Sequence, residues 1–294
     1  MGDCPAPRPL QPSNPHPGDP LMTDHRPLAP SSARFELHRG SSPLLISFPH
    51  VGQSIPEQFR HRLVPRALEV EDTDWNLDRL YGFAHALGAG LLIPSTSRYV
   101  IDLNRPSDNQ PMYPGQNNTE LCPTRFFTGE PLYRSGCEPN PAEVSERVMS
   151  WWQPYHLALA AELERLRGEH GHAVLFDAHS IKGELPWLFP GQLPDMNIGT
   201  ASGASCAPSL RTAVEAVFAR QSSYSWVIDG RFKGGHITRT YGRPDASVHA
   251  VQLEMSWRAY MLEDPPYLWH PARSAAVTPL LESLIRTLRD WSLH

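Results

Sequence analysis

A run of four apolar residues, AVLF at positions 173–176, is the feature that most restricts the fold of this chain. An unbroken apolar run of this length is typical of a strand covered on both faces, as in the parallel sheets of α/β proteins. The run leads directly into Asp177 and His179. Because ligands of open α/β sheets bind at the carboxyl ends of the strands, we expect these two polar residues to lie at a ligand site.

Strand-like and helix-like segments alternate along most of the chain. Strands are predicted near residues 43–48, 90–94, 98–103, 172–177, 225–229 and 249–255. Helices are predicted near residues 75–88, 143–169, 208–221 and 272–291. This alternation predicts an α/β fold with a mixed, mostly parallel sheet flanked by helices.

The distribution of proline separates a tail from one globular domain. Residues 1–33 are rich in proline and poor in large apolar residues, so burial cannot offset their ordering entropy, and they are predicted to be a disordered tail. Residues 34–294 show no linker or internal repeat, and we expect them to form a single α/β domain. Within it, residues 104–142 lack periodicity and are predicted to be a functional loop over the site.

Charge and composition exclude several classes of protein. The formal net charge is -5 without any cluster of Lys and Arg, which argues against binding to nucleic acid or to an anionic membrane. No apolar run approaches the roughly 18 residues of a membrane helix, and no signal-peptide pattern is present. The four cysteines are scattered without a CxxC pair, which indicates neither a thiolate zinc site nor a disulfide-rich secreted protein. We therefore expect a cytoplasmic protein.

Two histidines follow apolar strands, and both are candidate metal ligands. His50 ends the segment LLISFPH, and His179 follows AVLFDA. Imidazole nitrogens suit Zn²⁺, whose catalytic sites combine three protein ligands with an open position for water. An isolated histidine is more often a buried or surface polar residue, but the matched placement of these two favours a shared site. Asp72 or Asp74 would supply a carboxylate, although aspartate before a predicted helix is equally expected as an N-cap.

A glutamate, Glu254, interrupts the apolar strand VQLEMSW near its end. A buried carboxylate without a partner is costly, so it requires a cation, a proton or a catalytic task. Beside zinc, such a glutamate can accept a proton from bound water and pass it to a leaving amine. The alternative is a buried salt bridge with Arg258 or another arginine.

Two loops carry arginines that suit an anionic ligand. The first holds Arg98, Asn104 and Arg105, and guanidinium groups bind carboxylates in a bidentate fork. The second loop is rich in glycine and contains Arg231, His236, Arg239 and Arg243. Neither GxGxxG nor GxxxxGKS/T occurs, so a nucleotide-binding loop is not indicated.

Six motifs lie in order within residues 43–262: FPHVG, DTDWNLDRLY, SRYVIDLNRP, DAHS, FKGGHITRTYG and QLEMSWRAYM. The ordered set resembles the N-formylglutamate amidohydrolase (deformylase) family of histidine degradation. This resemblance implies a metal-dependent hydrolase similar in architecture to zinc carboxypeptidases and aspartoacylases. It also implies that the small-molecule substrate is N-formyl-L-glutamate, cleaved to formate and L-glutamate, whose two carboxylates would explain the arginines.

Carried over onto this sequence, the resemblance implies one divalent metal, zinc, held by His50 and His179. Zinc carboxypeptidases carry a glutamate three residues after their first histidine, but that position is Gln53 here. The carboxylate ligand must then come from elsewhere, and Asp74 is preferred to Asp72 because it directly precedes the helix. The other implied roles are water activation by Glu254, substrate binding by Arg98, Asn104, Arg105 and Arg239, a hydrogen bond from a ligand histidine to Asp177, and an acid or oxyanion-donor role for His236.

Two other functions fit the same residues. One is a different hydrolase, either a carboxypeptidase-like enzyme or another N-acyl amino-acid amidohydrolase. The other is a non-catalytic module that binds an acidic amino acid through its arginines. The sequence does not indicate an oligomeric state.

Overall fold

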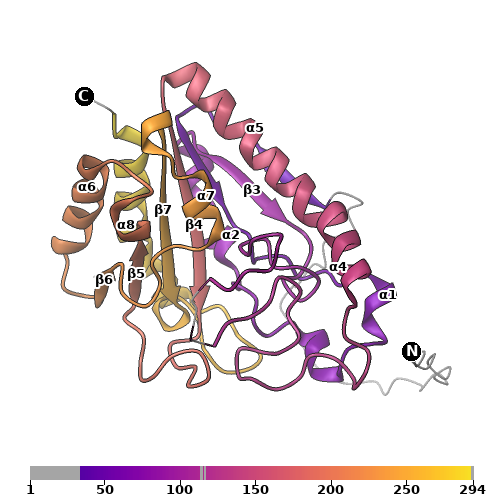
Figure 1. The fold of residues 1–294 in the computed structure, drawn as a ribbon. Coiled ribbons are helices and arrows are strands. Elements are labelled where there is room, and N and C mark those ends of the chain that lie inside the picture. Colours follow the sequence, from indigo (N-terminus) through magenta and orange to yellow (C-terminus); the bar gives the residue numbers. More distant parts are fainter. Residues whose placement is uncertain (1–33, 113–114, 116, 293–294) are drawn as a thin grey trace, which may run out of the picture.

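Seven strands form one sheet in the order β1-β3-β2-β4-β7-β5-β6 (Figure 1). The strands are β1 Phe35–His38, β2 Leu44–Ser47, β3 Gly90–Pro94, β4 Ala173–Ile181, β5 Met196–Gly199, β6 Trp226–Ile228 and β7 Val248–Ser256. The antiparallel pairs are β1 with β3 and β5 with β7, and the other neighbours are parallel, so the predicted mixed, mostly parallel sheet is confirmed. The structure is a computed structural model that describes residues 34–112, 115 and 117–292. The predicted tail, residues 1–33, lies outside the described residues.

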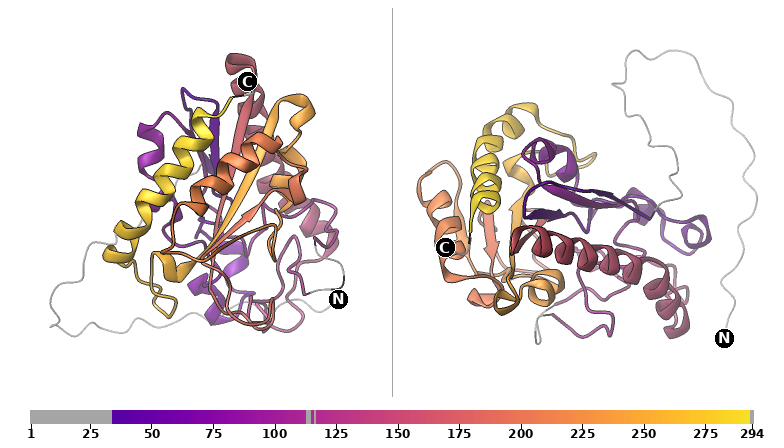
Figure 2. Two further views of the ribbon diagram at one scale, coloured as in Figure 1. Left: turned by 90° about the vertical axis from the view of Figure 1, so that its left-hand side faces the viewer. Right: turned by 90° about the horizontal axis from the view of Figure 1, so that it is seen from above.

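Helices cover both faces of the sheet (Figure 2). They are α1 Glu57–Arg60, α2 Leu77–Leu80, α3 Phe83–Ala86, α4 Pro141–Arg147, α5 Gln153–His170, α6 Pro208–Ala219, α7 His236–Tyr241 and α8 Pro271–Asp290. A π-helical stretch, Val148–Trp152, joins α4 to α5. Helices α5 and α7 lie on one face, and α2, α3, α6 and α8 lie on the other. In the described part of the chain, no helix combines the length and the apolar character needed to cross a membrane.

The alternation of side chains along β4 shows why its apolar run is unbroken. Ala173 and Leu175 pack in the core under α5 and α7. Val174, Phe176 and Ala178 pack in the core under α6 and α8. Successive side chains of a strand point to opposite faces, and both faces are covered by helices here, so every position of the run 173–176 is apolar. The prediction of a two-sided buried strand is confirmed.

On the face under α5 and α7, the apolar side chains give way to polar ones toward the carboxyl ends of β4 and β7. In β4 the series that begins with Ala173 and Leu175 continues with Asp177 and His179. In β7 the series Val248 and Ala250 continues with Gln252 and Glu254. The parallel register pairs Asp177 with Gln252 and His179 with Glu254. A patch of polar side chains therefore forms on one face of the sheet, at the lower end of β4 and β7 in Figure 1.

Several predicted elements differ from the structure. Residues 98–103 form turns and extended loop, not a strand, because their apolar side chains are buried against two separate cores. The helix predicted at 75–88 is divided into α2 and α3. Strand β4 runs on to Ile181, so His179 lies inside the strand and not beyond its end. The short elements β1, β5, α1 and α7 were not predicted, since four to six residues give too little periodicity.

Candidate metal and catalytic site

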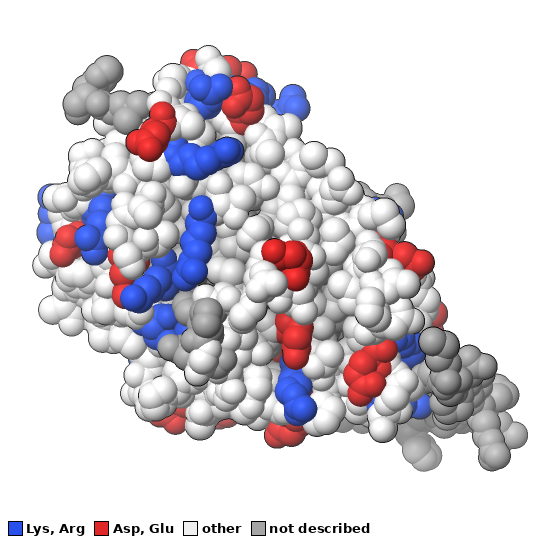
Figure 3. Space-filling model, viewed as in Figure 1, with Lys and Arg blue, Asp and Glu red and all other residues white. Residues whose placement is uncertain are grey.

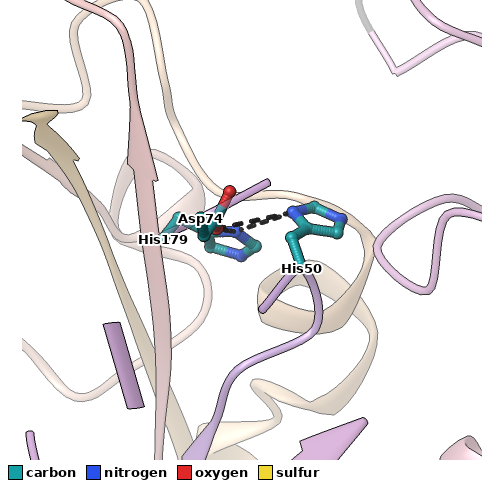
Figure 4. A group of neighbouring side chains, drawn as sticks. All are labelled: His50, Asp74 and His179. Carbon is teal, nitrogen blue, oxygen red and sulfur yellow. Dashed lines mark hydrogen bonds and ion pairs between the residues drawn. The ribbon is translucent and has the colours of Figure 1, made fainter. Parts of the chain in front are cut away.

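Two histidines and one aspartate converge at the polar end of the sheet (Figure 4). His50 lies in the turn after β2, Asp74 precedes α2, and His179 belongs to β4. The Nδ1 atoms of the two histidines are 3.1 Å apart. Asp74 Oδ2 lies 3.2 Å from Nδ1 of His179 and 3.7 Å from Nδ1 of His50. One potential ligand atom from each residue thus lies within 4.8 Å of the others, and the three side chains are buried.

The backbone around His50 brings Asp74 into this group. The Asp74 N–H donates to the carbonyl oxygen of His50 at 3.0 Å, so the segment before α2 is tied to the turn after β2. Asp74 does not cap the helix, because the N-cap residue of α2 is Asn76. Asp72 lies apart from the histidines, and its Oδ2 accepts hydrogen bonds from the hydroxyl of Tyr99 and the N–H of Phe127. Of the two aspartates, Asp74 is therefore the one that faces both histidines.

Each histidine of the group has a second carboxylate at its other ring nitrogen. His50 Nε2 lies 2.7 Å from Asp102 Oδ1, and His179 Nε2 lies 3.1 Å from Asp177 Oδ2. At His50 the carboxylate of Asp102 can accept a proton from Nε2, which leaves the Nδ1 lone pair available to a metal. At His179 the amide nitrogen of Asn104 also lies 2.9 Å from Nε2, so that nitrogen faces a donor as well as the carboxylate of Asp177. Two imidazole nitrogens and one carboxylate oxygen are a donor set that suits a divalent cation such as zinc and leaves a position open.

The charges of the site also favour a cation. The carboxylates of Asp74, Asp102, Asp177 and Glu254 are all buried, whereas Arg98 is the cation in ion-pair contact with two of them. Burial alone would raise the pKa of Asp74, but hydrogen bonds from His179 and His50 outweigh it and lower that pKa. Burial likewise disfavours the charge on His179, yet Asp177 and Asp74 hold its pKa well above the ordinary value. A bound cation would offset the excess of negative charge that now attracts a proton to His179.

Glu254 shares a pocket with the three clustered residues. Among the residues that the structure describes, none donates a hydrogen bond to its carboxylate or forms an ion pair with it, although the residue is only 8% exposed. Arg258 pairs with Asp195 at 2.8 Å, so the alternative of a Glu254–Arg258 salt bridge is wrong. Burial raises the pKa of Glu254 to about 8, although the positive charge of His179 acts to lower it. A carboxylate with such a pKa can accept a proton near neutral pH.

Arg98 and Asn104 line the pocket, and both are held by the protein. Arg98 Nη2 donates to Asp102 Oδ2 at 2.6 Å, and Nη1 lies 3.2 Å from His50 Nδ1. Asn104 Oδ1 accepts the N–H of Ile237 at 2.8 Å, which directs its amide nitrogen toward His179 and Asp177. Their contacts place these two residues against the candidate ligands.

The other predicted site residues lie in different surroundings. Arg105 lines the pocket and donates to the carbonyl and hydroxyl oxygens of Thr119 at 3.1 and 3.0 Å. Arg239 is on the exposed side of α7, where its Nε donates to the carbonyl oxygen of Gly234. His236 packs on Trp152, with ring centroids 5.7 Å apart. Neither Arg239 nor His236 is among the described residues that line the pocket.

Several pocket residues were absent from the predicted site. Asp102, which contacts His50 and Arg98 without lining the pocket, was also absent, although its position four residues after Arg98 was a usable signal. Arg231, from the glycine-rich loop, lines the pocket in place of Arg239. The long loop contributes Asn117, Asn118, Thr119 and Phe127, in agreement with its prediction as a loop over the site.

On the surface in Figure 3, Lys and Arg side chains form a column left of centre, and Asp and Glu gather to its right.

The sequence model of N-formylglutamate amidohydrolase matches residues 42–261, which is most of the chain. The chain belongs to this family. An N-formylglutamate deformylase of Pseudomonas aeruginosa is 47% identical over 253 residues, covering 86% of this chain and 95% of the relative. The deformylase of Pseudomonas putida is 45% identical over 254 residues, with the same shares covered.

Solved structures share the fold. N-formylglutamate amidohydrolase from Ralstonia eutropha JMP134 superposes with a TM-score of 0.74 at 23% identity, over 87% of this chain and 99% of that one. A gene product of Agrobacterium tumefaciens gives a TM-score of 0.64 at 18% identity, over 86% of this chain and 93% of the other. At this identity the likeness concerns the fold alone, and it agrees with the α/β architecture described above.

Proposed function

We propose that this protein hydrolyses N-formyl-L-glutamate to formate and L-glutamate. The observation that carries the proposal is the convergence of His50, Asp74, His179 and Glu254 in one pocket that also contains arginines. Membership of the N-formylglutamate amidohydrolase family, and two relatives named N-formylglutamate deformylase, support the same substrate. The family resemblance further implies a role in histidine degradation, and we keep a cytoplasmic location as a prediction.

His50, Asp74 and His179 would hold one divalent metal ion, which we propose to be zinc. The donor set fits this ion, because Nδ1 of both histidines and Oδ2 of Asp74 lie close together and a carboxylate lies beside Nε2 of each ring. When bound, such an ion polarises the formyl carbonyl and lowers the pKa of a water molecule beside it. The remaining steps are assigned to side chains of this chain.

Glu254 is the proposed proton carrier. It accepts the proton that water loses as the oxygen atom adds to the formyl carbon. It then delivers a proton to the amide nitrogen as the C–N bond breaks, so that L-glutamate leaves as an amine and the formyl group leaves as formate. The buried position of Glu254 in β7, in register with His179 of β4, holds its carboxylate beside the ligands throughout.

The arginines are proposed to bind the charged and polar groups of the substrate. Arg105 and Arg231 line the pocket and suit the two carboxylates of N-formylglutamate, since guanidinium binds carboxylate through paired hydrogen bonds. Arg98, beside His50, would donate to the formyl oxygen. Asn104, Arg239 and His236 are proposed to support these groups: Asn104 contacts His179, Arg239 holds Gly234, and His236 packs beside α5.

Formate release and metal content test the proposal together. Wild-type protein with about one zinc ion per chain should release formate from N-formyl-L-glutamate, and complete chelation should abolish the reaction. Glu254→Gln keeps the shape of the side chain but removes the proton acceptor, so zinc should remain while turnover falls by about 10²- to 10⁴-fold. Glu215→Gln, on the exposed side of α6, is the matched control.

Four outcomes would contradict parts of this proposal. Full activity after exhaustive chelation excludes the role of the metal. Loss of zinc from Glu254→Gln makes Glu254 a ligand and not the proton carrier. Faster hydrolysis of N-acetylglutamate or of a peptide than of N-formylglutamate identifies another amidohydrolase or a carboxypeptidase, and binding without turnover identifies a non-catalytic module.

A further inference from the structure

We infer that Phe127 limits the acyl group of the substrate, because this residue lines both the metal-site pocket and a second cavity. The inference rests on the proposed deformylase function and concerns the acyl side of the substrate. A formyl carbon carries a hydrogen where an acetyl carbon carries a methyl group. A wall beside the metal ligands can therefore distinguish the two by size alone.

The second cavity has a volume of about 280 Å³. Its lining includes Asp72, Leu185, Trp257 and Tyr267, none of which lines the metal-site pocket. Phe127 is the one lining residue that the two spaces share within the described part of the chain. Shortening this side chain would join the two spaces, and the second one is large enough for several carbon atoms.

Phe127 also lies close to the candidate metal ligands. Its ring centroid is 4.5 Å from the guanidinium carbon of Arg98. Nη1 of that same guanidinium is 3.2 Å from His50 Nδ1 and 4.0 Å from Asp74 Oδ1. The side chain of Arg98 thus lies between the ring of Phe127 and the candidate ligands.

The apolar side of the pocket is the place for an acyl chain. It is formed by Phe127, Ile181, Leu188 and Phe232, which belong to or pack against one apolar cluster. Arg231 lies against Leu188 and Phe232, so a carboxylate of glutamate would occupy that end of the pocket, and an acyl substituent at the metal site would face Phe127. Within that side, Phe127 is the member whose removal opens a space beyond the wall.

The backbone holds Phe127 firmly in place. Its N–H donates to Asp72 Oδ2 at 3.0 Å, and the same oxygen accepts the hydroxyl of Tyr99 at 2.8 Å. The turn is closed by hydrogen bonds between Phe126 and Glu130 and from the N–H of Gly129. A Cβ added to Gly129 would lie 2.7 Å from Trp187, so the turn is packed closely against its neighbour. A methyl group cannot displace a side chain held in this way without repacking its surroundings.

The test compares kcat/KM for N-acetyl-L-glutamate with kcat/KM for N-formyl-L-glutamate in zinc-loaded protein. This ratio should rise by about 10- to 200-fold in Phe127→Ala, the discrimination that one carbon gives in a pocket. It should rise in the order Phe127→Leu, Phe127→Val, Phe127→Ala as the wall becomes smaller. All three variants lose the ring contact with Arg98, so that loss cannot produce the order. If the alanine variant does not fold, the leucine and valine variants carry the comparison.

Two further variants distinguish the loss of the Phe127 side chain from a general enlargement of either space. Leu188→Ala removes apolar volume from the metal-site pocket without reaching the second cavity, so any rise in the ratio should be smaller than in Phe127→Ala. Leu185→Ala enlarges the second cavity behind an intact wall and should leave the ratio unchanged. Combined with Phe127→Val, Leu185→Ala should extend the accepted group to N-propionyl-L-glutamate.

The outcomes distinguish this inference from the function on which it rests. An unchanged ratio in Phe127→Val that still hydrolyses N-formylglutamate overturns the role of Phe127 and leaves the deformylase function standing. An equal rise in Leu188→Ala has the same meaning. Failure of the wild-type protein to release formate from N-formylglutamate overturns the deformylase function, and the inference with it.

Discussion

Four buried carboxylates lie near two histidines in this protein, and their contacts give each of them a different task. Asp74 faces Nδ1 of both histidines, while Asp102 and Asp177 each hold one Nε2. Glu254 has no hydrogen-bond donor to its carboxylate among the described residues. A carboxylate can therefore act as a metal ligand, hold a ligand histidine in place or act as a base, and its contacts determine which.

Asp102→Asn tests the support of His50. Asparagine keeps the size of the side chain, but His50 loses an anionic acceptor at 2.7 Å and Arg98 loses an ion-pair partner at 2.6 Å. Zinc affinity, measured by competition with a chelator, should fall by about 10- to 100-fold. Asp195→Asn, which removes a carboxylate paired with Arg258 outside the site, is the matched control. Equal zinc affinity in wild type and Asp102→Asn would show that Asp102 does not support the metal.

Arg105→Lys tests whether Arg105 binds a carboxylate of the substrate. Lysine retains the charge but cannot form two parallel hydrogen bonds to a carboxylate. Transition-state stabilisation should therefore fall by about 2–3 kcal/mol, which lowers kcat/KM on N-formyl-L-glutamate by roughly 30- to 150-fold. The loss should shrink for the one analogue that lacks the carboxylate bound by Arg105. N-formyl-L-glutamine lacks the side-chain carboxylate, and 4-formamidobutanoate lacks the α-carboxylate. Equal losses on all three compounds would mean that Arg105 acts through its hydrogen bonds to Thr119 and supports the loop.

Site residues that end or interrupt an apolar strand could be predicted from the sequence. Site residues whose partners are distant in the sequence could not. His50, His179 and Glu254 could be selected because each is a polar residue in an apolar context. Asp102 could not be assigned to His50 in this way, because 52 residues separate them and only the tertiary structure joins them. The glycine-rich loop has no periodicity, so nothing in the sequence distinguished Arg231, which lines the pocket, from Arg239, which does not. The roles of these residues stay predictions.

At the level of elements, β4 and β7 show what a strand pattern can and cannot predict. The apolar run of β4 predicted a strand covered on both faces, and the structure places Asp177 and His179 on a single face of that strand. Residues 98–103 have a similar alternating pattern but form a loop, because burial of alternate side chains does not require a strand. Helix α7 has six residues, which is too short for a helical period to be recognised.

Gly235→Ala tests the close approach of the α7 segment to the site. A Cβ at Gly235 would lie 2.3 Å from the amide nitrogen of Asn104, which contacts His179. Displacing Asn104 should lower kcat/KM by about 10²-fold, the cost of misplacing a site by about 1 Å. Gly168→Ala is the control, because a Cβ there meets nothing within 4 Å and Gly168 lies inside α5. That variant should keep its activity and gain about 0.5–1 kcal/mol of stability in urea unfolding. Full activity of Gly235→Ala would show that Asn104 tolerates displacement.

At the scale of the whole molecule, the two helical layers pack on different kinds of surface. Helices α6 and α8 cover an apolar face of the sheet. Helices α5 and α7 cover the face that becomes polar toward the site, so their layer must accommodate polar groups between core and pocket. His156 of α5 is one of these, 4% exposed and stacked on Trp152 with ring centroids 3.8 Å apart. Its Nε2 lies 2.9 Å from the carbonyl oxygen of Leu103, and its Nδ1 lies 2.9 Å from the hydroxyl of Tyr241.

The burial of His156 predicts that acid destabilises the whole fold. Burial lowers the pKa of His156 from 6.5 to about 3, and nearby His236 opposes its charge as well. Between these two pKa values the unfolded chain binds a proton that the folded chain does not, so stability is complete above pH 6.5 and falls as the pH drops toward 3. This residue should therefore cost about 2 kcal/mol of unfolding free energy between pH 7 and pH 5. His156→Gln keeps a donor for the Leu103 carbonyl but does not titrate, so urea unfolding of this variant should lose less stability over that interval by the same amount. An identical pH dependence in the two proteins would mean that His156 is protonated in the fold, and that its hydrogen bonds to Leu103 and Tyr241 tolerate the charge.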